Sequence, residues 1–213
     1  MAEQNSDLHG NVPDCSAVAV LLIDVINDLE FPGGDRLLPY ALAAADATAS
    51  LKRRARTAGV PVIYVNDNFG RWRSDFQHLV RHCLGDVRGR PIAERLRPDP
   101  DDYFVLKPKH SGFFSTTLDI LLDYLGAKAL VLAGLTGDNC VLFTASDAYM
   151  RDFRLAVPCD CVASIDPREN EEALRHMQRV LKADIGPSAK LDLGKLVAEA
   201  GSNPAPHLQR RST

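Results

Sequence analysis

Short apolar runs of strand length alternate along this chain with longer stretches whose apolar residues recur every three or four positions. The runs with strand character cover 17–23, 61–65, 103–106, 129–133 and 155–162. All but the last are almost continuously apolar, which is typical of strands buried on both faces of a sheet. Helical spacing covers 38–58, 116–125, 139–152 and 170–183. Gly59 and Gly126 stand where a left-handed residue commonly ends a helix.

This alternation predicts an α/β fold. Strands that alternate with helices form a mostly parallel sheet with helices on both faces, here a single-domain, Rossmann-like three-layer sandwich. A chain of 213 residues is long enough for one such domain. We expect the domain to span residues 17–200, preceded by a polar arm, 1–16, and followed by a flexible tail, 201–213.

The amino-acid composition indicates which class of molecule the protein binds. Lys and Arg total 25 against 28 Asp and Glu, so the net charge of -3 provides no basic surface for nucleic acid or an anionic membrane. The first sixteen residues lack the basic start and apolar core of a secretory signal, and the five cysteines are odd in number and scattered. We therefore expect a cytoplasmic protein with reduced thiols that acts on a small molecule.

Three predicted strand ends carry reactive side chains. Asp24 directly follows the apolar strand 17–23, Lys107 ends 103–106 just before a proline, and Cys140 follows 129–133 at the start of a helical stretch. Each has an ordinary structural explanation by itself: a turn aspartate, a solvated edge lysine and a small buried thiol. In a parallel sheet, however, the carboxyl ends of the strands meet at one edge, where active sites gather.

Together the three residues predict a nucleophile with a base and a charge partner. We expect Cys140 in the first turn of a helix, where free N–H groups and the helix dipole stabilise a thiolate. A nucleotide-binding module of similar architecture is disfavoured, because the stretch after the first strand, IDVINDLEFPGG, lacks a GxGxxG turn.

At these positions the sequence resembles a known family. The stretches LLIDVIND, KPKHSGFFSTTLD and GLTGDNCVLFTASDAYMRDF are similar to motifs of the isochorismatase-like cysteine hydrolases, which include nicotinamidases, carbamoylsarcosine amidohydrolase and biuret hydrolase. The last stretch is the most specific, because it combines the apolar strand, the glycine, the spacing to the cysteine and a TAxDA helix. The resemblance covers about residues 17–184 and implies an Asp-Lys-Cys triad of Asp24, Lys107 and Cys140, with Lys109 as the rival lysine.

The resemblance also implies a mechanism. It indicates a hydrolase that cleaves a C–N bond of a small amide or ureido compound through a thioester, with no cofactor. Asp24 is expected as general base and Lys107 as its charge partner. The backbone N–H groups of Thr136 and Cys140 are expected to form the oxyanion hole, with a cis peptide at Leu135-Thr136. Family members are commonly dimers or tetramers, which implies a homodimer or homotetramer.

The sequence departs from the family pattern, and these departures change what we expect of metal binding and of the reaction. Nicotinamidases carry a metal site around an Asp-x-His unit, but here no histidine follows Asp67 until His78, so we predict no such metal site. We interpret His78 and His82 as surface or interface residues, because no third ligand is identifiable. Vinyl-ether hydrolases of the family lack the cysteine, which leaves isochorismatase chemistry as a weaker alternative. A catalytically silent scaffold of the same fold is the other alternative.

Specificity is expected from two loops, 66–76 and 111–114. The candidate substrate-binding residues are Asn66, Phe69, Trp72, Phe113 and Phe114. Trp72, the single tryptophan, is expected to cover either the pocket or a partner subunit. Cys159 and Cys161 alternate within the last predicted strand, so we expect both on one face with a packing role.

Overall fold

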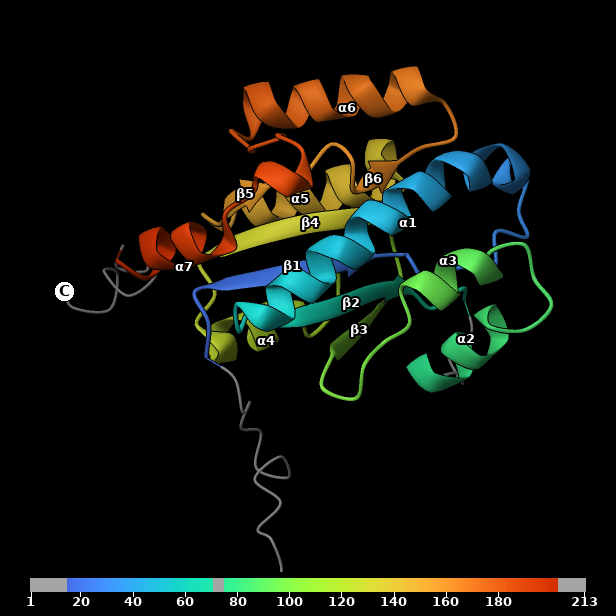
Figure 1. Ribbon diagram of the computed structural model, residues 1–213, viewed down its shortest axis with the longest axis horizontal. Coiled ribbons are helices and arrows are strands. Elements are labelled where there is room, and N and C mark those ends of the chain that lie inside the picture. The colour runs from blue at the N-terminus through green and yellow to red at the C-terminus, as the bar shows by residue number, and fades with distance from the viewer. Residues whose placement is uncertain (1–14, 71–74, 203–213) are drawn as a thin grey trace, which may run out of the picture.

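A six-stranded sheet forms the centre of the molecule (Figure 1), as described by the computed structural model for residues 15–70 and 75–202. The strands are β1 (Val18–Ile23), β2 (Val62–Asp67), β3 (Tyr103–Lys107), β4 (Ala129–Leu135), β5 (Arg154–Ala156) and β6 (Val162–Ala163). They run in the order β3-β2-β1-β4-β5, with β6 also paired to β4, and every pairing is parallel. The predicted α/β fold with a mostly parallel sheet is therefore confirmed.

Helices cover both faces of this sheet, which is why β1 and β4 are apolar along their whole length. One face packs against α1 (Gly34–Thr57), α2 (Phe76–Cys83), α3 (Arg90–Arg95) and α7 (Leu193–Gly201). The other face packs against α4 (Leu118–Leu125), α5 (Leu142–Tyr149) and α6 (Pro167–Val180). Figure 1 shows α1 crossing the near side of the sheet, with α4 and α5 behind it.

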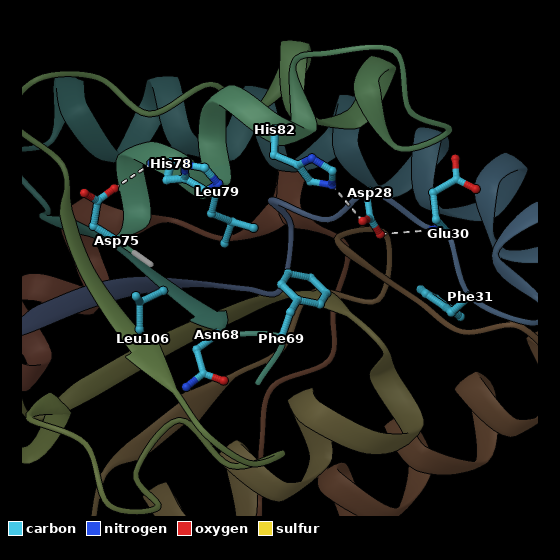
Figure 2. A pocket seen from close by; sticks show the side chains of 10 residues that line it. All are labelled: Asp28, Glu30, Phe31, Asn68, Phe69, Asp75, His78, Leu79, His82 and Leu106. Carbon is cyan, nitrogen blue, oxygen red and sulfur yellow. Dashed lines mark hydrogen bonds and ion pairs between the residues drawn. The ribbon is translucent and has the colours of Figure 1, made fainter. Parts of the chain in front are cut away.

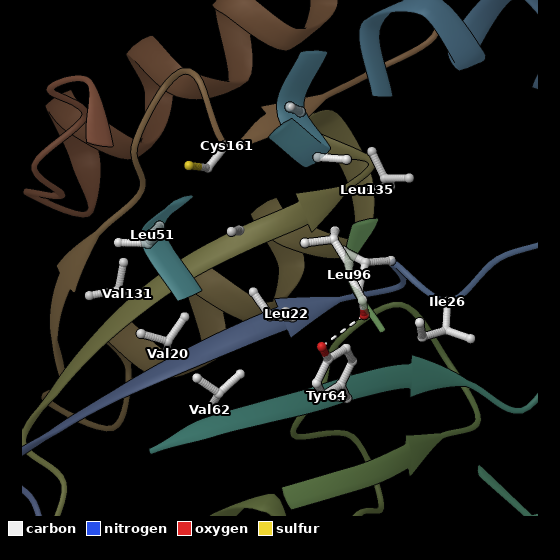
Figure 3. Close-up of a cluster of buried hydrophobic side chains, with 14 of the residues drawn as sticks. Val20, Leu22, Ile26, Leu51, Val62, Tyr64, Leu96, Val131, Leu135 and Cys161 are labelled. Carbon is white, nitrogen blue, oxygen red and sulfur yellow. Dashed lines mark hydrogen bonds between the residues drawn. The ribbon is translucent and has the colours of Figure 1, made fainter. Parts of the chain in front are cut away.

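The strands divide the apolar core into two clusters because successive side chains point to opposite faces. On β1, Val20 and Leu22 belong to the cluster under α1, whereas Leu21 and Ile23 belong to the cluster under α5. Figure 3 shows the first cluster, where Leu22 and Val131 from neighbouring strands lie beneath Leu51 of α1. Position along a strand thus decides which layer a side chain reaches.

Helix boundaries agree in part with the predicted ones. Gly59 and Gly126 have φ angles of 65° and 73°, so both follow their helices in the left-handed conformation that the sequence predicted. Three short helices, α2, α3 and α7, were not predicted, because stretches of six to nine residues hold too few apolar repeats to show a helical period.

The last predicted strand, 155–162, is wrong as one element. It is divided into β5 and β6 by a turn at Pro158, whose carbonyl accepts a hydrogen bond from the Cys161 N–H. Proline has no N–H for the ladder, so the pairing stops there. The predicted common face of the two cysteines is wrong for the same reason, since Cys159 is exposed and Cys161 is buried.

The predicted arm and tail are covered by the structure only in small part. The predicted arm, 1–16, and tail, 201–213, lie outside the described residues except for 15, 16, 201 and 202. Within the described part of the chain, no helix is long and apolar enough to cross a membrane.

A buried lysine joins α1 to the loop before β3. The Lys52 ammonium contacts the carboxylates of Asp99 and Asp102 at 3.0 and 2.6 Å and donates to the hydroxyl of Tyr64 at 2.9 Å. Tyr64 in turn donates to the carbonyl of Leu96, as Figure 3 shows. The side chains of Lys52 and Asp102 are only 7% and 4% exposed, so each charge depends on the other.

Replacing this lysine is expected to destabilise the fold. Lys52→Met leaves the Asp102 carboxylate buried without its main cation, so we expect the free energy of unfolding to fall by about 3 kcal/mol. Arg56→Met is the matched control, because Arg56 contacts Asp99 and Asp102 but its side chain is 41% exposed, and we expect it to cost less than about 1 kcal/mol. Urea unfolding followed by circular dichroism measures the free energy of unfolding of both variants. Equal losses would contradict the conclusion that the buried Asp102 carboxylate depends on Lys52.

Candidate active site

The predicted triad residues meet at the carboxyl edge of the sheet. The Lys107 ammonium lies 2.8 Å from the Asp24 carboxylate and 3.6 Å from the sulfur of Cys140. The negative charge of Asp24 also acts on the Cys140 thiol and raises its pKa. The side chains of Lys107 and Asp24 are 0% and 7% exposed, so this ion pair is closed off from water. The rival lysine, Lys109, is exposed and contributes only its carbonyl, which accepts from Lys107 at 3.2 Å.

The end of β1 turns Asp24 toward that lysine. Strand alternation would place Asp24 on the α1 face with Leu22. Its φ angle of 50° breaks the alternation, and the left-handed conformation brings the carboxylate to Lys107 on the other face. The second carboxylate oxygen accepts the N–H of Asp67 from β2 at 2.6 Å. The strand between β1 and β3 therefore helps to hold Asp24 in place.

The end of β4 delivers the cysteine. Gly134 has a φ angle of 130°, and a Cβ atom there would lie 2.0 Å from the carbonyl oxygen of Ile23, so only glycine fits beside β1. The Leu135-Thr136 peptide is cis, as the family resemblance implied. Cys140 follows in η2 (Gly137–Val141), a π-helical turn that precedes α5. Cys140 thus lies in the first turn of the helical segment, as expected, and that turn is π-helical.

Side chains behind the π-helical turn hold its backbone. The hydroxyl of Ser164, a buried residue after β6, accepts the N–H of Asp138 at 3.1 Å and lies 2.7 Å from the Asp138 carboxylate. A Cβ atom on Gly137 would lie 2.1 Å from the side-chain oxygen of Asn170 in α6, so glycine is needed for this close approach. The turn that carries Cys140 is therefore packed firmly against α6.

Burial decides the protonation of the resting site. Desolvation, together with the negative charge of Asp24, raises the pKa of the Cys140 thiol to about 12, against the opposing effect of Lys107. Desolvation also raises the pKa of Asp24 above its ordinary value, although Lys107 opposes it. Burial disfavours the charged form of Lys107, but Asp24 and Cys140 outweigh burial and raise its pKa. In the resting site these shifts favour a protonated sulfur and a charged lysine.

The loop after β3 is tied to the helix that follows Cys140. The fully buried hydroxyl of Thr144 accepts the N–H of Gly112 at 3.0 Å and donates to the carbonyl of Cys140 at 2.7 Å. One turn further along α5, Asp147 accepts a short hydrogen bond from Ser111. We call this pair of contacts, made by Thr144 and Asp147 to Gly112 and Ser111, the loop clamp. It fixes the cysteine relative to the segment that begins at Lys107.

An arginine supports the loop clamp from the far end of α5. Arg151 contacts Asp147 at 3.4 Å and Asp119 of α4 at 2.9 Å. Its guanidinium also lies 4.6 Å from the ring centre of Phe113. Arg151 therefore holds the loop between β3 and α4 in two ways: through Asp147, which binds Ser111, and through the ring of Phe113.

His110 also contacts the cysteine, and it was not among the predicted site residues. Its Nδ1 atom lies 3.9 Å from the sulfur of Cys140, and its ring centre lies 5.6 Å from that of Phe143. The residue is exposed, in contrast to Asp24 and Lys107. The available signal was its place three residues after Lys107, within the stretch that carries the lysine.

The predicted substrate-binding residues differ in burial and in their position in the fold. Phe114 is 54% exposed near this edge of the sheet, whereas Phe113 is 5% exposed and packs in the core against Phe153. Asn66 is fully buried and donates to the carbonyl of Ile26 at 2.7 Å, while its Oδ1 has no partner within the described part of the chain. Phe113 and Asn66 therefore offer no exposed surface to a ligand. Trp72 lies outside the described residues.

Phe69 lines a separate cavity of about 210 Å³, shown in Figure 2. The lining residues are Asp28, Glu30, Phe31, Asn68, Phe69, Asp75, His78, Leu79, His82 and Leu106. None of the triad residues is among them, and Leu106 packs toward the α1 face, opposite to its neighbour Lys107. The cavity therefore belongs to the other side of the sheet edge and not to the surroundings of Cys140.

The two histidines of α2 both line this cavity. His82 lies 2.9 Å from the carboxylate of Asp28, and the backbone N–H of His78 donates to Asp75 (Figure 2). Residues 15–70 and 75–202 contain no group of three or more His, Cys, Asp or Glu side chains arranged to hold a metal ion.

Comparison with known proteins places the chain among hydrolases of one family. Residues 18–185 match the family model of the isochorismatase domain. The uncharacterized isochorismatase family protein YaaI of Bacillus subtilis is 40% identical over 167 residues, 78% of this chain and 92% of that protein. Maleamate amidohydrolase of Pseudomonas putida is 32% identical, over 71% of this chain and 75% of its own. The crystal structure of N-carbamoylsarcosine amidase from Thermoplasma acidophilum superposes with a TM-score of 0.62 at 28% identity, covering 82% of this chain and 98% of the other.

Removing the charge of Asp24 is expected to make Cys140 more reactive toward an alkylating agent. In Asp24→Asn the negative charge that raises the thiol pKa is absent while Lys107 remains, so the pKa falls from about 12. Because the thiolate is the alkylating form, the rate at neutral pH rises. Iodoacetamide labelling of Cys140 across a pH series, read by peptide mass spectrometry, measures this shift. The labelling rate of the exposed Cys15 is the internal reference. An unchanged or slower labelling rate at Cys140 would show that the charge of Asp24 does not raise the pKa of the Cys140 thiol.

Removing the hydroxyl of Thr144 is expected to lower kcat. Thr144→Val has nearly the same shape but leaves the buried N–H of Gly112 without its acceptor, at a cost of about 1–3 kcal/mol in stability. The loop clamp is then broken between Lys107 and Cys140. Thr144→Ser keeps the hydroxyl and is the matched control. A kcat that falls in Thr144→Ser but not in Thr144→Val, measured as hydrolysis of p-nitrophenyl acetate, would show that packing of the methyl group matters and not the hydrogen bonds.

Proposed function

This chain belongs to the isochorismatase family, and we propose that it is a cysteine-dependent hydrolase that cleaves a carbon–nitrogen bond in a small amide or ureido compound. The contacts of Lys107 with both Asp24 and Cys140, which gather the three side chains at one point, are the observation that carries this proposal. The similar proteins with known names support the bond type, because maleamate amidohydrolase and N-carbamoylsarcosine amidase are both named for hydrolysis at nitrogen.

The first half of the reaction forms a thioester. Asp24, whose pKa is raised by burial, accepts the proton of the Cys140 thiol. The charged Lys107 stabilises both the carboxylate and the thiolate, which attacks the carbonyl carbon of the substrate. The C–N bond then breaks, and the leaving nitrogen takes the proton from Asp24. No cofactor takes part in this sequence.

Two backbone groups serve the developing oxyanion in this proposal. They are the N–H groups of Thr136 and Cys140, at the start of the π-helical turn. Within the described residues, the Thr136 N–H donates no hydrogen bond, so it is available to a substrate oxygen. The contacts of Ser164 with Asp138 hold this turn in position before substrate arrives.

Assembly of identical subunits is the second part of the proposal. Exposed apolar side chains stand on α4, on α5 and directly after α5: Ile120 at 58%, Tyr124 at 59%, Phe143 at 52% and Met150 at 69%. The two helices are held together by the ion pair between Arg151 and Asp119. These side chains support a homodimer or homotetramer. The further parts of the proposal, a place in the cytoplasm and no nucleic-acid or membrane partner, rest on the net charge of -3 and on the sequence of the first sixteen residues.

Substrate screening with a cysteine variant tests the activity. We expect ammonia or amine release from at least one primary amide or ureido compound, maleamate and N-carbamoylsarcosine included, together with an acyl adduct in the intact mass. Cys140→Ala should abolish both, because it removes the nucleophile. Cys15→Ala, at an exposed cysteine away from the triad, is the matched control and should keep both.

Two results would argue against the proposal. Equal release by wild type and Cys140→Ala would exclude a cysteine nucleophile. A silent panel, together with labelling of Cys140 no faster in Asp24→Asn than in wild type, would favour a scaffold that keeps the fold without turnover.

A further inference from the structure

The oxyanion hole of the proposed mechanism depends on a short backbone segment, 136–138, between β4 and Cys140. In that mechanism Thr136 supplies one of the two N–H groups, and its carbonyl accepts the N–H groups of Asn139 and Val141 at 3.2 and 3.1 Å. These two hydrogen bonds lie within the turn itself. They give the segment its local shape, but its orientation relative to the sheet must come from contacts with other elements.

A serine that follows β6 holds this segment from behind. β6 pairs with the last residues of β4, so that Ala163 lies beside Leu135, and Ser164 comes next in the chain. The hydroxyl of Ser164 accepts the N–H of Asp138 at 3.1 Å and lies 2.7 Å from the carboxylate of the same residue. Because Ser164 is 1% exposed, water does not compete for either contact.

An asparagine of α6 completes this support. The side-chain oxygen of Asn170 lies 3.0 Å from the hydroxyl of Ser164, and it fills the space where a Cβ atom on Gly137 would lie. The N–H of Asn170 donates to the carbonyl of Asp166, the residue that caps α6, so the asparagine is itself fixed by the first turn of that helix. The turn is therefore held from outside at two successive residues, Gly137 and Asp138.

We propose that Ser164 is a positioning residue for the oxyanion hole, with Asn170 as its support. This role rests on the proposed function, which supplies the substrate carbonyl. An oxyanion hole stabilises a transition state only when its donors already point at the place that the charged oxygen will occupy. The N–H that Ser164 binds is two residues after that of Thr136. Ser164 touches no reacting atom and acts by preventing this backbone from turning as negative charge develops.

This role separates two reactions of the same sulfur. Attack on a carbonyl passes through an oxyanion, both when the thioester forms and when water hydrolyses it, so both steps need the oxyanion hole. Iodoacetamide reacts differently, because the sulfur displaces iodide from a saturated carbon and no oxyanion forms. Its rate depends on the supply of thiolate, which Asp24 and Lys107 control. Loss of the Ser164 hydroxyl should therefore slow acyl transfer and leave alkylation unchanged.

Two reagents applied to Ser164→Ala test this separation. With p-nitrophenyl acetate, we expect the burst that reports acetylation of Cys140 and the steady-state rate both to fall by about 10-fold. With iodoacetamide, the labelling rate of Cys140, read by peptide mass spectrometry, should stay within about twofold of wild type. Ser164→Thr keeps the hydroxyl, and the cavity of about 260 Å³ that Ser164 lines leaves room for the added methyl group. This variant should restore both acyl-transfer rates.

Two further variants support the comparison. Ser146→Ala is the matched control, because the hydroxyl of Ser146 donates to the carbonyl of Leu142 within α5, and it should match wild type with both reagents. Asn170→Ala removes the support of Ser164 but leaves its hydroxyl. We expect it to slow acetylation while labelling stays unchanged, and it provides the test if Ser164→Ala does not fold.

The outcomes against the proposal are distinct. If Ser164→Ala is acetylated as fast as wild type, or if acetylation and iodoacetamide labelling fall to the same extent, Ser164 does not position the oxyanion hole. If wild type forms no acetyl adduct that Cys140→Ala lacks, the proposed cysteine hydrolase is itself refuted, and the role of Ser164 with it.

Discussion

The site is built around one buried positive charge. Lys107 has no exposed side-chain surface, and an ammonium in such a place is stable only with a close counter-ion and good acceptors. Asp24, the carbonyl of Lys109 and the sulfur of Cys140 are the groups that surround it. Three strand ends must therefore converge on Lys107, and the left-handed turn at Asp24 is part of the same requirement.

The TAxDA stretch gains a physical meaning from these contacts. Its two alanines, Ala145 and Ala148, are fully buried and let α5 lie close to the sheet. Its threonine and aspartate, Thr144 and Asp147, bind the loop that starts at Lys107. One helix thus carries the nucleophile at its start and also fixes the lysine segment, so the distance between them is set by a single rigid element.

Apolar periodicity was enough to predict the parallel sheet, its buried strands and the edge where reactive side chains gather, but not the order of the strands. Strands such as β1 and β4 are apolar throughout, so their layer is evident without coordinates. Protonation was not predictable in this way: the thiol pKa depends on burial and on Asp24, which lies far away in the sequence. The residues that line the surroundings of Cys140 could not be predicted from the sequence either. Phe113 and Phe114 are neighbours in the chain, yet one is buried and the other is exposed. His110 is recognisable only from the distance between its ring and the Cys140 sulfur.

The ion pair of Asp24 and Lys107 joins β1 to β3, which are not neighbours in the sheet, and Asp67 of the intervening β2 completes it. Contacts between segments so distant in the chain require the intervening strand and helices to close a loop, which local contacts do not. A nascent or partly folded chain therefore holds Cys140 without its base and its cation. The raised pKa of the Cys140 thiol is therefore a property of the completed sheet, present only once β1 has brought Asp24 into place beside β3 and β4.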